Sequence, residues 1–280
     1  MKKIDLHIHT TASDGSFTPS EIVKMAFDDG LAAIAISDHD TVSGYEEARE
    51  AGLKLGIPVV PGIEISTKYG GPIHILGYYI DVHSEKLRPV LDWMIHDRDE
   101  RNEKMAELMA ADGLPVSYEK MKQRFGEAIG RPHFARILVE LGLARNTRDA
   151  FDRYVEKGQK YYLPRNFLSI ERSVEIIREA GGVPVLAHPF QYRRDDAGLR
   201  DIIDHCMEYG LMGMECRYSG YSEEQSNYLE ALADEYGLIK TGGSDFHGIS
   251  KPEIKLGEGK HGSLNVPFEF YEKLREAAGR

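Results

Sequence analysis

Short runs of apolar and β-branched residues alternate with helix-forming segments along most of this chain, and this alternation limits the possible folds more than any other feature. The expected strands cover residues 3–9, 32–37, 58–65, 73–79, 183–187, 213–216 and 238–241. Capping patterns mark the helix starts between them, for example Thr18-Pro19-Ser20-Glu21. Strands that alternate with helices in this way form βαβ units and a mainly parallel sheet. The expected fold class is therefore α/β.

The alternation stops between residues 84 and 164, where helix signals occur without a convincing strand. One helix face is indicated by apolar residues at the spacing i, i+3, i+4, i+7, i+8, namely Leu87, Val90, Leu91, Met94 and Ile95. We therefore expect a helical insertion or cap at 84–164, carried by an α/β body formed from 1–83 and 165–280. Trp93, beside this stripe, is expected to anchor the insertion to the body.

Composition narrows the function classes. The 46 acidic residues outnumber the 35 basic ones and give a formal net charge of −11, which argues against a broad surface for duplex DNA. Two cysteines are too few for a disulfide framework or a thiolate metal site. The longest apolar run has about six residues, whereas a membrane-spanning helix needs about 20. We expect a cytoplasmic protein without a secretory signal or a membrane span.

Histidines and acidic residues gather at the ends of the expected strands. His7 and His9 lie two apart in a strand, so their side chains leave the same face and could supply two imidazoles to a metal. A solvated strand face explains this pair equally well. Seven further potential ligands occur in comparable places: Asp14, His39, Glu64, His74, His188, Asp245 and His247. Most follow a strand, where α/β sites gather; His74, near the start of its run, is the exception and on its own would be a core histidine.

The motifs in the chain resemble those of a known family. Asp-Leu-His-Ile-His-Thr, Ser-Asp-His-Asp-Thr, Gly-Ile-Glu, Ala-His-Pro and Gly-Ser-Asp-Phe-His occur in this order between residues 2 and 248. Together they resemble the motif set of the PHP (polymerase and histidinol phosphatase) family of metal-dependent phosphoesterases. The resemblance implies a distorted (β/α)7 barrel of the PHP type, with a helical insertion and up to three divalent ions.

The resemblance also implies a ligand set. One ion would be held by His7, His9, Glu64 and Asp245, a second by Glu64, His74 and His188, and a third by Asp14, His39 and His247. Asp38 and Asp40 are expected to orient ligands rather than to bind metal. Some relatives have histidine at the position of Asp14, and an aspartate there favours Mn²⁺, Mg²⁺ or Fe²⁺ over Zn²⁺. We expect two to three divalent ions, with Mn²⁺ favoured.

This ligand set has a chemical consequence. Six neutral histidines and three carboxylates bring a charge of −3 against +6 for three divalent ions, which leaves about +3 to attract a phosphate. Metal coordination lowers the pKa of water to about 7. The expected reaction is therefore attack of a metal-bound hydroxide on phosphorus.

A second cluster, at residues 130–136, concerns the substrate. Arg131 and Arg136 lie in the first turns of an expected helix, where anions bind readily, and His133 could contact a phosphate or protonate a leaving oxygen. A solvated basic helix start explains the same residues. However, the Arg-Pro-His segment resembles the PHP branch that contains nucleoside 3′,5′-bisphosphate phosphatases and the 5′→3′ exoribonuclease RNase AM. This resemblance implies that Arg131, His133 and Arg136 bind substrate. Arg165, Arg193, Arg194 and Arg217 are either further phosphate contacts or surface charges.

The expected function is hydrolysis of a phosphate ester of a small nucleotide, foremost a nucleoside 3′,5′-bisphosphate, or the trimming of 5′-phosphorylated short RNA. The expected partners are such a nucleotide or short single-stranded RNA, without duplex DNA or a membrane. Four alternatives remain: a histidinol-phosphate phosphatase, an amidohydrolase, a polymerase-associated module, and a non-catalytic metal or nucleotide sensor.

Overall fold

The computed structural model describes residues 2–126 and 129–280. Its main sheet has the strand order β1-β2-β3-β4-β6-β7-β8, with β5 paired to β3 beside this path. These strands are β1 (Lys3–Ile8), β2 (Leu31–Ile36), β3 (Val59–Lys68), β4 (Pro72–Tyr78), β5 (Leu168–Ser169), β6 (Val183–Leu186), β7 (Gly213–Tyr218) and β8 (Ile239–Gly243). All seven expected strands are thus present, with ends that differ by a few residues. A small hairpin, β9 (Ile254–Lys255) with β10 (Gly259–Lys260), lies outside the main sheet.

The two outermost strands meet and nearly close the sheet into a barrel. Beyond the end of β8, the Asp245 amide donates to the His7 carbonyl at 2.8 Å, and the His9 amide donates to the Phe246 carbonyl at 3.0 Å. Seven strands therefore form an irregular ring, which confirms the expected distorted (β/α)7 barrel.

The direction of β4 departs from the expected parallel arrangement. It runs antiparallel to both β3 and β6, with Ser66 opposite His74 and Tyr78 opposite Val183. The start of β4 therefore lies at the same end of the barrel as the carboxyl ends of its neighbours. This explains why His74 belongs with the other candidate ligands although it begins a strand.

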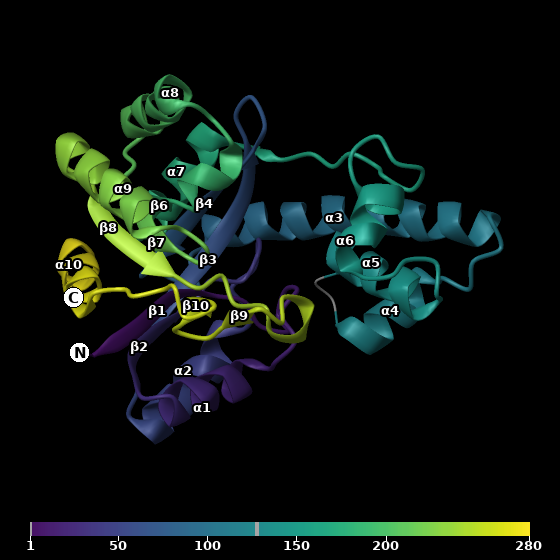
Figure 1. The fold of residues 1–280 in the computed structure, drawn as a ribbon, viewed down its shortest axis with the longest axis horizontal. Coiled ribbons are helices and arrows are strands. Elements are labelled where there is room, and N and C mark those ends of the chain that lie inside the picture. The colour runs from purple at the N-terminus through teal and green to yellow at the C-terminus, as the bar shows by residue number, and fades with distance from the viewer. Residues whose placement is uncertain (1, 127–128) are drawn as a thin grey trace.

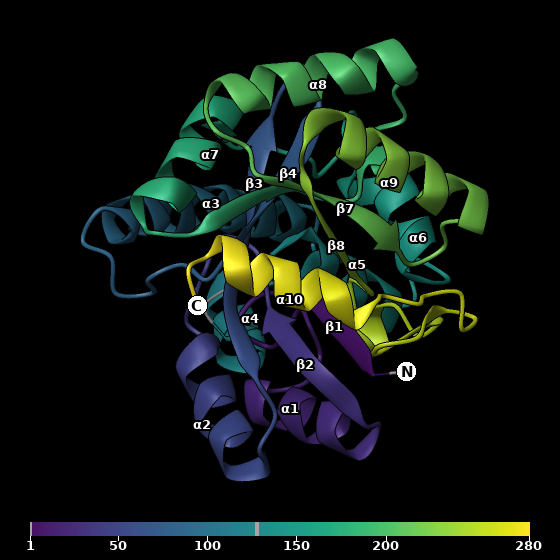
Figure 2. The same cartoon turned by 90° about the vertical axis from the view of Figure 1, so that its left-hand side faces the viewer.

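Helices pack around the barrel (Figures 1 and 2). They are α1 (Pro19–Asp28), α2 (Tyr45–Leu55), α7 (Ile170–Glu179), α8 (Asp196–Glu208), α9 (Glu223–Tyr236) and α10 (Phe268–Ala277). The expected capping box at Thr18 and Glu21 starts α1. Figure 2 shows α10 crossing the barrel end that faces away from α4–α6, where Leu274 packs in one apolar cluster with Ile4 and Leu6.

The helical segment after β4 has its own apolar core. It comprises α3 (Leu87–Ala111), α4 (Tyr118–Phe125), α5 (Arg131–Glu140), α6 (Thr147–Ala150) and the π-helical turn η1 (Phe151–Val155). No strand lies between β4 and β5 in the part of the chain that the structure describes. A cluster including Met105, Met109, Phe134 and Leu138 is separate from the barrel clusters, and Figure 1 shows these helices projecting from one side of the barrel.

Helix α3 connects the two parts. Its first turns contribute Leu87, Leu91 and Met94 to the core of the barrel, while its later turns belong to the helical cluster. The prediction that Trp93 anchors the segment is wrong, because this side chain is 42% exposed and the three apolar residues take that role. Among the described residues, no helix combines the length and apolar character that a membrane crossing requires.

Candidate metal centre and adjoining pocket

The nine predicted ligands come together at the barrel end that faces the helical segment. β1 and its following loop supply His7, His9 and Asp14, and the remaining six lie on strands β3 and β4 or just beyond β2, β6 and β8. Two of them occupy unusual backbone conformations, since φ is +25° at His188 and +56° at Asp245. A positive φ in a residue other than glycine is uncommon. The strand ends are therefore bent locally in a way that turns these side chains toward the centre.

Potential ligand atoms converge in four overlapping groups whose members lie within 4.8 Å of one another. These groups are His9, Asp14, His39 and His247; His7, His9 and Asp245; His7, Glu64 and His188; and His39, Glu64 and His74. Every predicted ligand belongs to at least one group. The shared members are His7, His9, His39 and Glu64, so the four groups form one continuous cluster.

Glu64 lies at the centre of this cluster. Its side chain is 1% exposed, and nitrogens of five histidines approach its two oxygens. The distances are 2.8 Å to His74 Nδ1, 2.8 Å to His188 Nε2, 2.9 Å to His39 Nδ1, 3.4 Å to His9 Nε2 and 3.5 Å to His7 Nε2. A single carboxylate can satisfy this many imidazoles only in part.

Several buried nitrogen and oxygen atoms of the cluster lack hydrogen-bond partners, and this suits the cluster to bind divalent metal ions. The buried atoms without a hydrogen-bond partner include His7 Nε2, His9 Nε2, His39 Nδ1, Asp14 Oδ1 and Glu64 Oε2. Buried polar groups are normally hydrogen-bonded because leaving them unpaired is costly. Here these nitrogens and oxygens converge on one another, as ligand atoms around a cation do. The all-nitrogen-and-oxygen donor set suits Mn²⁺, Fe²⁺, Mg²⁺ and Zn²⁺.

The pKa shifts within the cluster also agree with a site for metal ions. Burial lowers the pKa of His39, but Glu64 and Asp14 outweigh this effect and raise it to about 9. Burial also raises the pKa of Glu64, yet the surrounding histidines hold it well below its usual value. By contrast, burial together with His247 and His39 lowers the pKa of His9. Without ions the cluster therefore holds protons, which metal ions would displace on binding.

Glu215 is a functional residue that the sequence analysis missed. It is fully buried on β7, lies 3.0 Å from His7 Nδ1 and accepts a 2.7 Å hydrogen bond from the His188 amide. It therefore orients two predicted ligands from outside the cluster. The signal was present, since Glu215 interrupts an apolar strand just as Glu64 does.

The remaining carboxylates are held by neighbouring donors. Tyr218 and Lys251 each donate to Asp245 Oδ2 at 2.7 Å, which leaves Oδ1 facing His9 at 3.2 Å. Asp38 accepts from the hydroxyls of Thr10 and Ser13 and belongs to none of the four groups. Asp38 thus fixes the loop that carries Asp14.

Asp40 joins the barrel to the helical segment. Its buried carboxylate accepts from Ser66 of β3, from Arg98 of α3 and, at 2.9 Å, from Arg165. Burial raises the pKa of Asp40, but Arg165 and Arg98 outweigh this and hold it below its usual value. Asp40 therefore remains ionised and positions two arginines beside the cluster of potential ligands.

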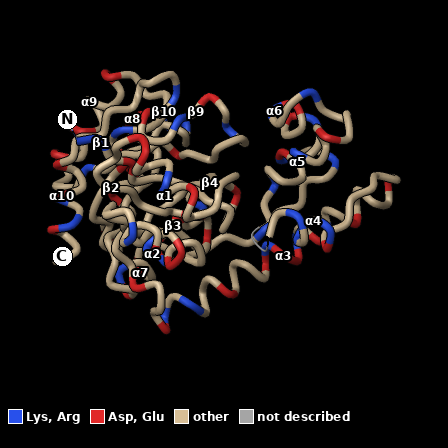
Figure 3. Tube along the Cα trace, turned by 90° about the horizontal axis from the view of Figure 1, so that it is seen from below, with Lys and Arg blue, Asp and Glu red and all other residues tan. Residues whose placement is uncertain are grey.

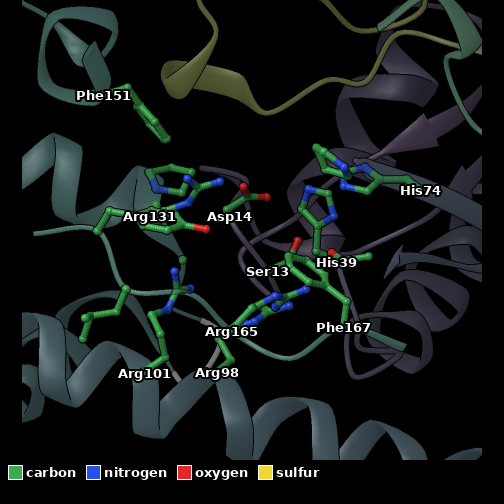
Figure 4. Close-up of a pocket in the computed structure, with 16 residues that line it drawn as sticks. Ser13, Asp14, His39, His74, Arg98, Arg101, Arg131, Phe151, Arg165 and Phe167 are labelled. Carbon is green, nitrogen blue, oxygen red and sulfur yellow. The ribbon is translucent and has the colours of Figure 1, made fainter. Parts of the chain in front are cut away.

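A pocket of about 220 Å³ lies between the cluster and the helical segment (Figure 4). His39, His74 and Asp14 form one side of it. Four arginines contribute to the rest of its wall, namely Arg98, Arg101, Arg131 and Arg165, together with the aromatic residues Phe151, Tyr162 and Phe167. The pocket thus combines potential metal ligands, positive charge and aromatic surface.

Arg131, predicted to bind substrate, lines this pocket. Its guanidinium lies 5.6 Å from the ring centroids of both Phe151 and Tyr162 and 3.2 Å from Glu156. These contacts fix its position. The Glu156 pair is partly exposed, so it contributes little energy and leaves Arg131 available to an anion.

His133 and Arg136, the other two predicted substrate residues, lie in a neighbouring cavity that also reaches Asp14. His133 is buried, and its Nδ1 accepts a hydrogen bond from the Gly130 amide at 2.9 Å. Arg136 pairs with Glu140 at 3.1 Å. The structure therefore divides the predicted trio between two cavities, both of which border the cluster.

Arg98 and Arg101 were not predicted, although α3 contains a signal for them. They continue the face of Leu87, Leu91 and Met94 and are themselves buried. Arginines rarely occupy the buried face of a helix without a partner. Arg98 agrees with this rule, because it contacts the buried carboxylate of Asp40.

Comparisons with known proteins agree with this geometry. The sequence profile described as the PHP domain matches residues 5–209. A 5′-3′ exoribonuclease from Haemophilus influenzae is 35% identical over 247 residues, which cover 88% of this chain and 90% of that protein. A 3′,5′-nucleoside bisphosphate phosphatase from Chromobacterium violaceum is 33% identical over 250 residues, with 88% of each protein covered.

A similar fold occurs among solved structures. The crystal structure of a candidate metal-dependent phosphoesterase from Bifidobacterium adolescentis superposes with a TM-score of 0.87 at 32% sequence identity. The match covers 98% of this chain and 96% of that chain. The barrel and the helical segment are therefore both shared with this structure.

Proposed function

Because this chain belongs to the PHP domain family of metal-dependent phosphoesterases, we propose that it hydrolyses a phosphate ester of a small nucleotide. The foremost substrate is a nucleoside 3′,5′-bisphosphate, and the second is the 5′ end of a short RNA. Relatives that carry these two activities in their names match most of the chain. We further propose that the reaction takes place in the cytoplasm, where the two buried free cysteines would remain reduced.

The single observation that carries this proposal is the convergence of five histidines on the buried carboxylate of Glu64, next to a pocket lined by arginines. The cluster would hold two to three divalent ions, with Mn²⁺ favoured. When bound, such ions lower the pKa of water and stabilise negative charge on phosphoryl oxygens. The arginine-lined pocket beside them would bind the rest of a phosphorylated substrate.

The residues around the cluster have separate tasks in this proposal. Glu215 fixes the orientation of His7 and the backbone of His188. Arg131 would attract and position the substrate, and Arg136 would extend positive charge along the second cavity. His133 Nδ1 accepts a hydrogen bond from the Gly130 amide, so in the neutral ring the proton sits on Nε2. Burial lowers the pKa of His133, and the neutral ring would donate a hydrogen bond from Nε2 to a phosphate or leaving oxygen.

A metal-reconstituted substrate panel tests the proposal. Purified protein is treated with chelator, supplied with Mn²⁺, and assayed with adenosine 3′,5′-bisphosphate, a 5′-phosphorylated oligoribonucleotide, histidinol phosphate and an amide substrate. We expect release of phosphate or nucleotide from the first two and no activity in excess chelator. Faster hydrolysis of histidinol phosphate or of the amide would contradict the nucleotide assignment. Tight ligand binding without turnover in Mn²⁺ would identify a sensor instead.

A further inference from the structure

We propose that a second and larger cleft, on another side of the cluster, is a track for single-stranded RNA. This α6 cleft lies mainly between residues 145–156 and residues 248–260. It would hold the nucleotides that follow the scissile bond. The inference rests on the proposed function and deepens it, because it assigns a place to the part of an RNA substrate that extends beyond its first nucleotide.

The size of the α6 cleft exceeds what a mononucleotide requires. Its volume is about 1040 Å³, against about 220 Å³ for the arginine-lined pocket. Pockets for small ligands measure about 300–1,000 Å³. Figures 1 and 3 show the loop before β9 extending toward the helical segment, so that the two sides of the cleft belong to different parts of the molecule. A nucleotide bound in the pocket leaves this second space free, whereas a longer strand can continue into it.

The α6 cleft reaches the cluster through residues that contact a potential metal ligand. Tyr218 and Lys251 line the cleft, and each donates to Asp245 Oδ2 at 2.7 Å. The arginine-lined pocket instead borders His39, His74 and Asp14. A strand with its scissile phosphate at the cluster could therefore place its first nucleotide in the pocket and the following ones in the cleft.

The charge of the α6 cleft suits a phosphate backbone. Its lining includes four cationic side chains and two carboxylates, in a chain with a net charge of −11; they are Arg145, Arg148, Lys251 and Lys260, and Glu156 and Glu253. Arg145 and Arg148 pair with Asp149 and Asp152, but their side chains are 84% and 80% exposed. Such exposed pairs contribute little energy, so both guanidinium groups remain available to phosphates.

The apolar residues of the α6 cleft favour a single strand over a duplex. Phe151 and Tyr218 are half-buried aromatic residues in its wall, and Ile249 is 68% exposed in the loop before β9. Proteins that bind single strands combine a positively charged groove along the backbone with side chains on which bases stack. A duplex keeps its bases stacked on one another and cannot use these surfaces. The lining therefore matches unpaired RNA.

A double variant tests the track without altering a residue that contacts the cluster. Arg148→Gln and Lys260→Gln are combined, and kcat/KM in Mn²⁺ is measured for a 5′-phosphorylated octaadenylate and for adenosine 3′,5′-bisphosphate. We expect the ratio of the first value to the second to fall by about tenfold, because only the longer substrate reaches the cleft. An unchanged ratio would overturn the track.

The matched control removes the same two kinds of charge elsewhere. Arg49 on α2 and Lys273 on α10 are exposed, each has an acidic neighbour on its own helix, and neither lines the cleft. Arg49→Gln combined with Lys273→Gln should keep the wild-type ratio. A fall as large as that of the cleft variant would mean that overall charge, rather than the cleft, attracts RNA.

Binding in excess chelator makes the test independent of catalysis. The fluorescence anisotropy of a 3′-labelled, 5′-phosphorylated octaadenylate is followed over a range of KCl concentrations. For single strands, the slope of log affinity against log salt changes by about 0.7 for each neutralised phosphate, so the cleft variant should show a slope smaller by about 1.4. A slope equal to that of wild type would contradict the track.

These measurements separate the track from the proposed function. If binding depends on Arg148 and Lys260 but no ester is hydrolysed in Mn²⁺, the function fails and the track stands. If both substrates are hydrolysed and neither the ratio nor the slope changes, the track fails and the function stands. A glutamate octapeptide that binds the wild-type protein as tightly as the octaadenylate would identify a docking surface for an acidic protein segment and overturn the assignment to RNA.

Discussion

Glu64 and Glu215 are two buried carboxylates that act on the histidines from opposite sides. Glu64 faces five imidazoles from within the cluster, whereas Glu215 contacts His7 Nδ1 from behind. An imidazole that is fixed at one nitrogen presents the other in a defined direction. The geometry of the proposed metal site therefore depends on a residue outside the four groups of potential ligands.

The first prediction concerns Glu215. Glu215→Gln retains size but loses the charge that orients His7, so we expect affinity for Mn²⁺ to fall by about 10–100-fold. Isothermal titration of the chelator-treated variant measures this change. Glu208→Gln, on the exposed surface of α8, should bind like wild type. Equal affinities in the two variants would contradict the role given to Glu215.

The second prediction concerns pH. Without metal, the pKa of His39 is about 9 in the folded protein against an ordinary value of 6.5. A raised pKa means that its contribution to stability is complete below about pH 6.5 and is lost as the pH rises through about 9. Urea midpoints of chelator-treated protein should therefore fall between pH 6.5 and 9, with a smaller fall in His39→Gln.

Saturating Mn²⁺ should reverse this pH trend, since metal binding requires the neutral imidazole and strengthens as protons leave. Stability of the metal-loaded protein should therefore rise over the same range. A fall of equal size with and without Mn²⁺ would mean that His39 does not bind metal.

At the residue scale, the sequence indicates the nine potential ligands because they occur in short motifs at strand ends. Arg98, Arg101 and Glu215 cannot be identified from short motifs. Their roles depend on which element they face, and that is decided by the packing of α3 and β7 rather than by neighbouring residues. Arg101 in particular becomes informative only when its buried position in the wall of the pocket is known.

At the scale of elements, the close approach of β8 to β1 holds the barrel together where the ligands lie. Gly243 packs against the backbone of His7, and a Cβ at this position would overlap that backbone, with His7 Cα only 2.8 Å away. A glycine is therefore required for β8 to lie beside the His-x-His strand.

The third prediction follows from this contact. Gly243→Ala should displace β8 from β1, reduce stability by about 1–3 kcal/mol and weaken metal binding through His7. Chemical denaturation and Mn²⁺ titration measure the two effects. Gly71→Ala is the control, because its added Cβ would meet only the end of the Arg194 side chain at 3.5 Å. Wild-type stability in Gly243→Ala would show that the strands can separate without cost.

The fourth prediction concerns the contact between α3 and the barrel. Arg98→Met leaves Asp40 with Arg165 and Ser66, so the buried carboxylate loses one charged partner and stability should fall by about 1–3 kcal/mol. Hydrogen exchange should increase in α3 near residue 98, whereas Arg148→Met should leave it unchanged. Unaltered exchange in Arg98→Met would mean that the apolar contacts of Leu87, Leu91 and Met94 hold the helix on their own.

The sequence predicted which segments form strands and helices better than it predicted the direction of each strand in the sheet. Alternating strands and helices indicated the α/β class, the resemblance to the PHP family implied the barrel, and the structure confirms both. The antiparallel direction of β4 was not predictable from periodicity, because side chains alternate in the same way in parallel and antiparallel strands. Only its pairing with β3 through a tight turn and with β6 sets the orientation that brings His74 to the site.

At the scale of the whole molecule, an acidic protein encloses a locally basic pocket. Figure 3 shows acidic and basic residues interspersed over the barrel and the helical segment, while the net charge is −11. Four arginines nevertheless meet beside the cluster. The positive charge of the pocket therefore lies where an anionic substrate would bind.

The division into a barrel and a helical segment is predictable in outline only. The break in the alternation at residue 84 indicated where the segment begins, but α3 starts within the barrel core and ends in the helical core. One continuous helix cannot be assigned to either part from its sequence pattern. The boundaries at 84 and 164 remain a prediction that limited proteolysis can examine.

The most direct test of the account counts metal ions and turnover in the same samples. Chelator-treated wild type and His7→Ala are titrated with Mn²⁺, free ion is measured by electron paramagnetic resonance, and phosphate release from adenosine 3′,5′-bisphosphate is followed. We predict two to three bound ions per wild-type chain, release that rises with occupancy, and a loss of both in a folded His7→Ala protein. Full phosphate release in excess chelator, or unchanged metal binding and release in His7→Ala, would contradict the claim that these side chains form a catalytic metal centre.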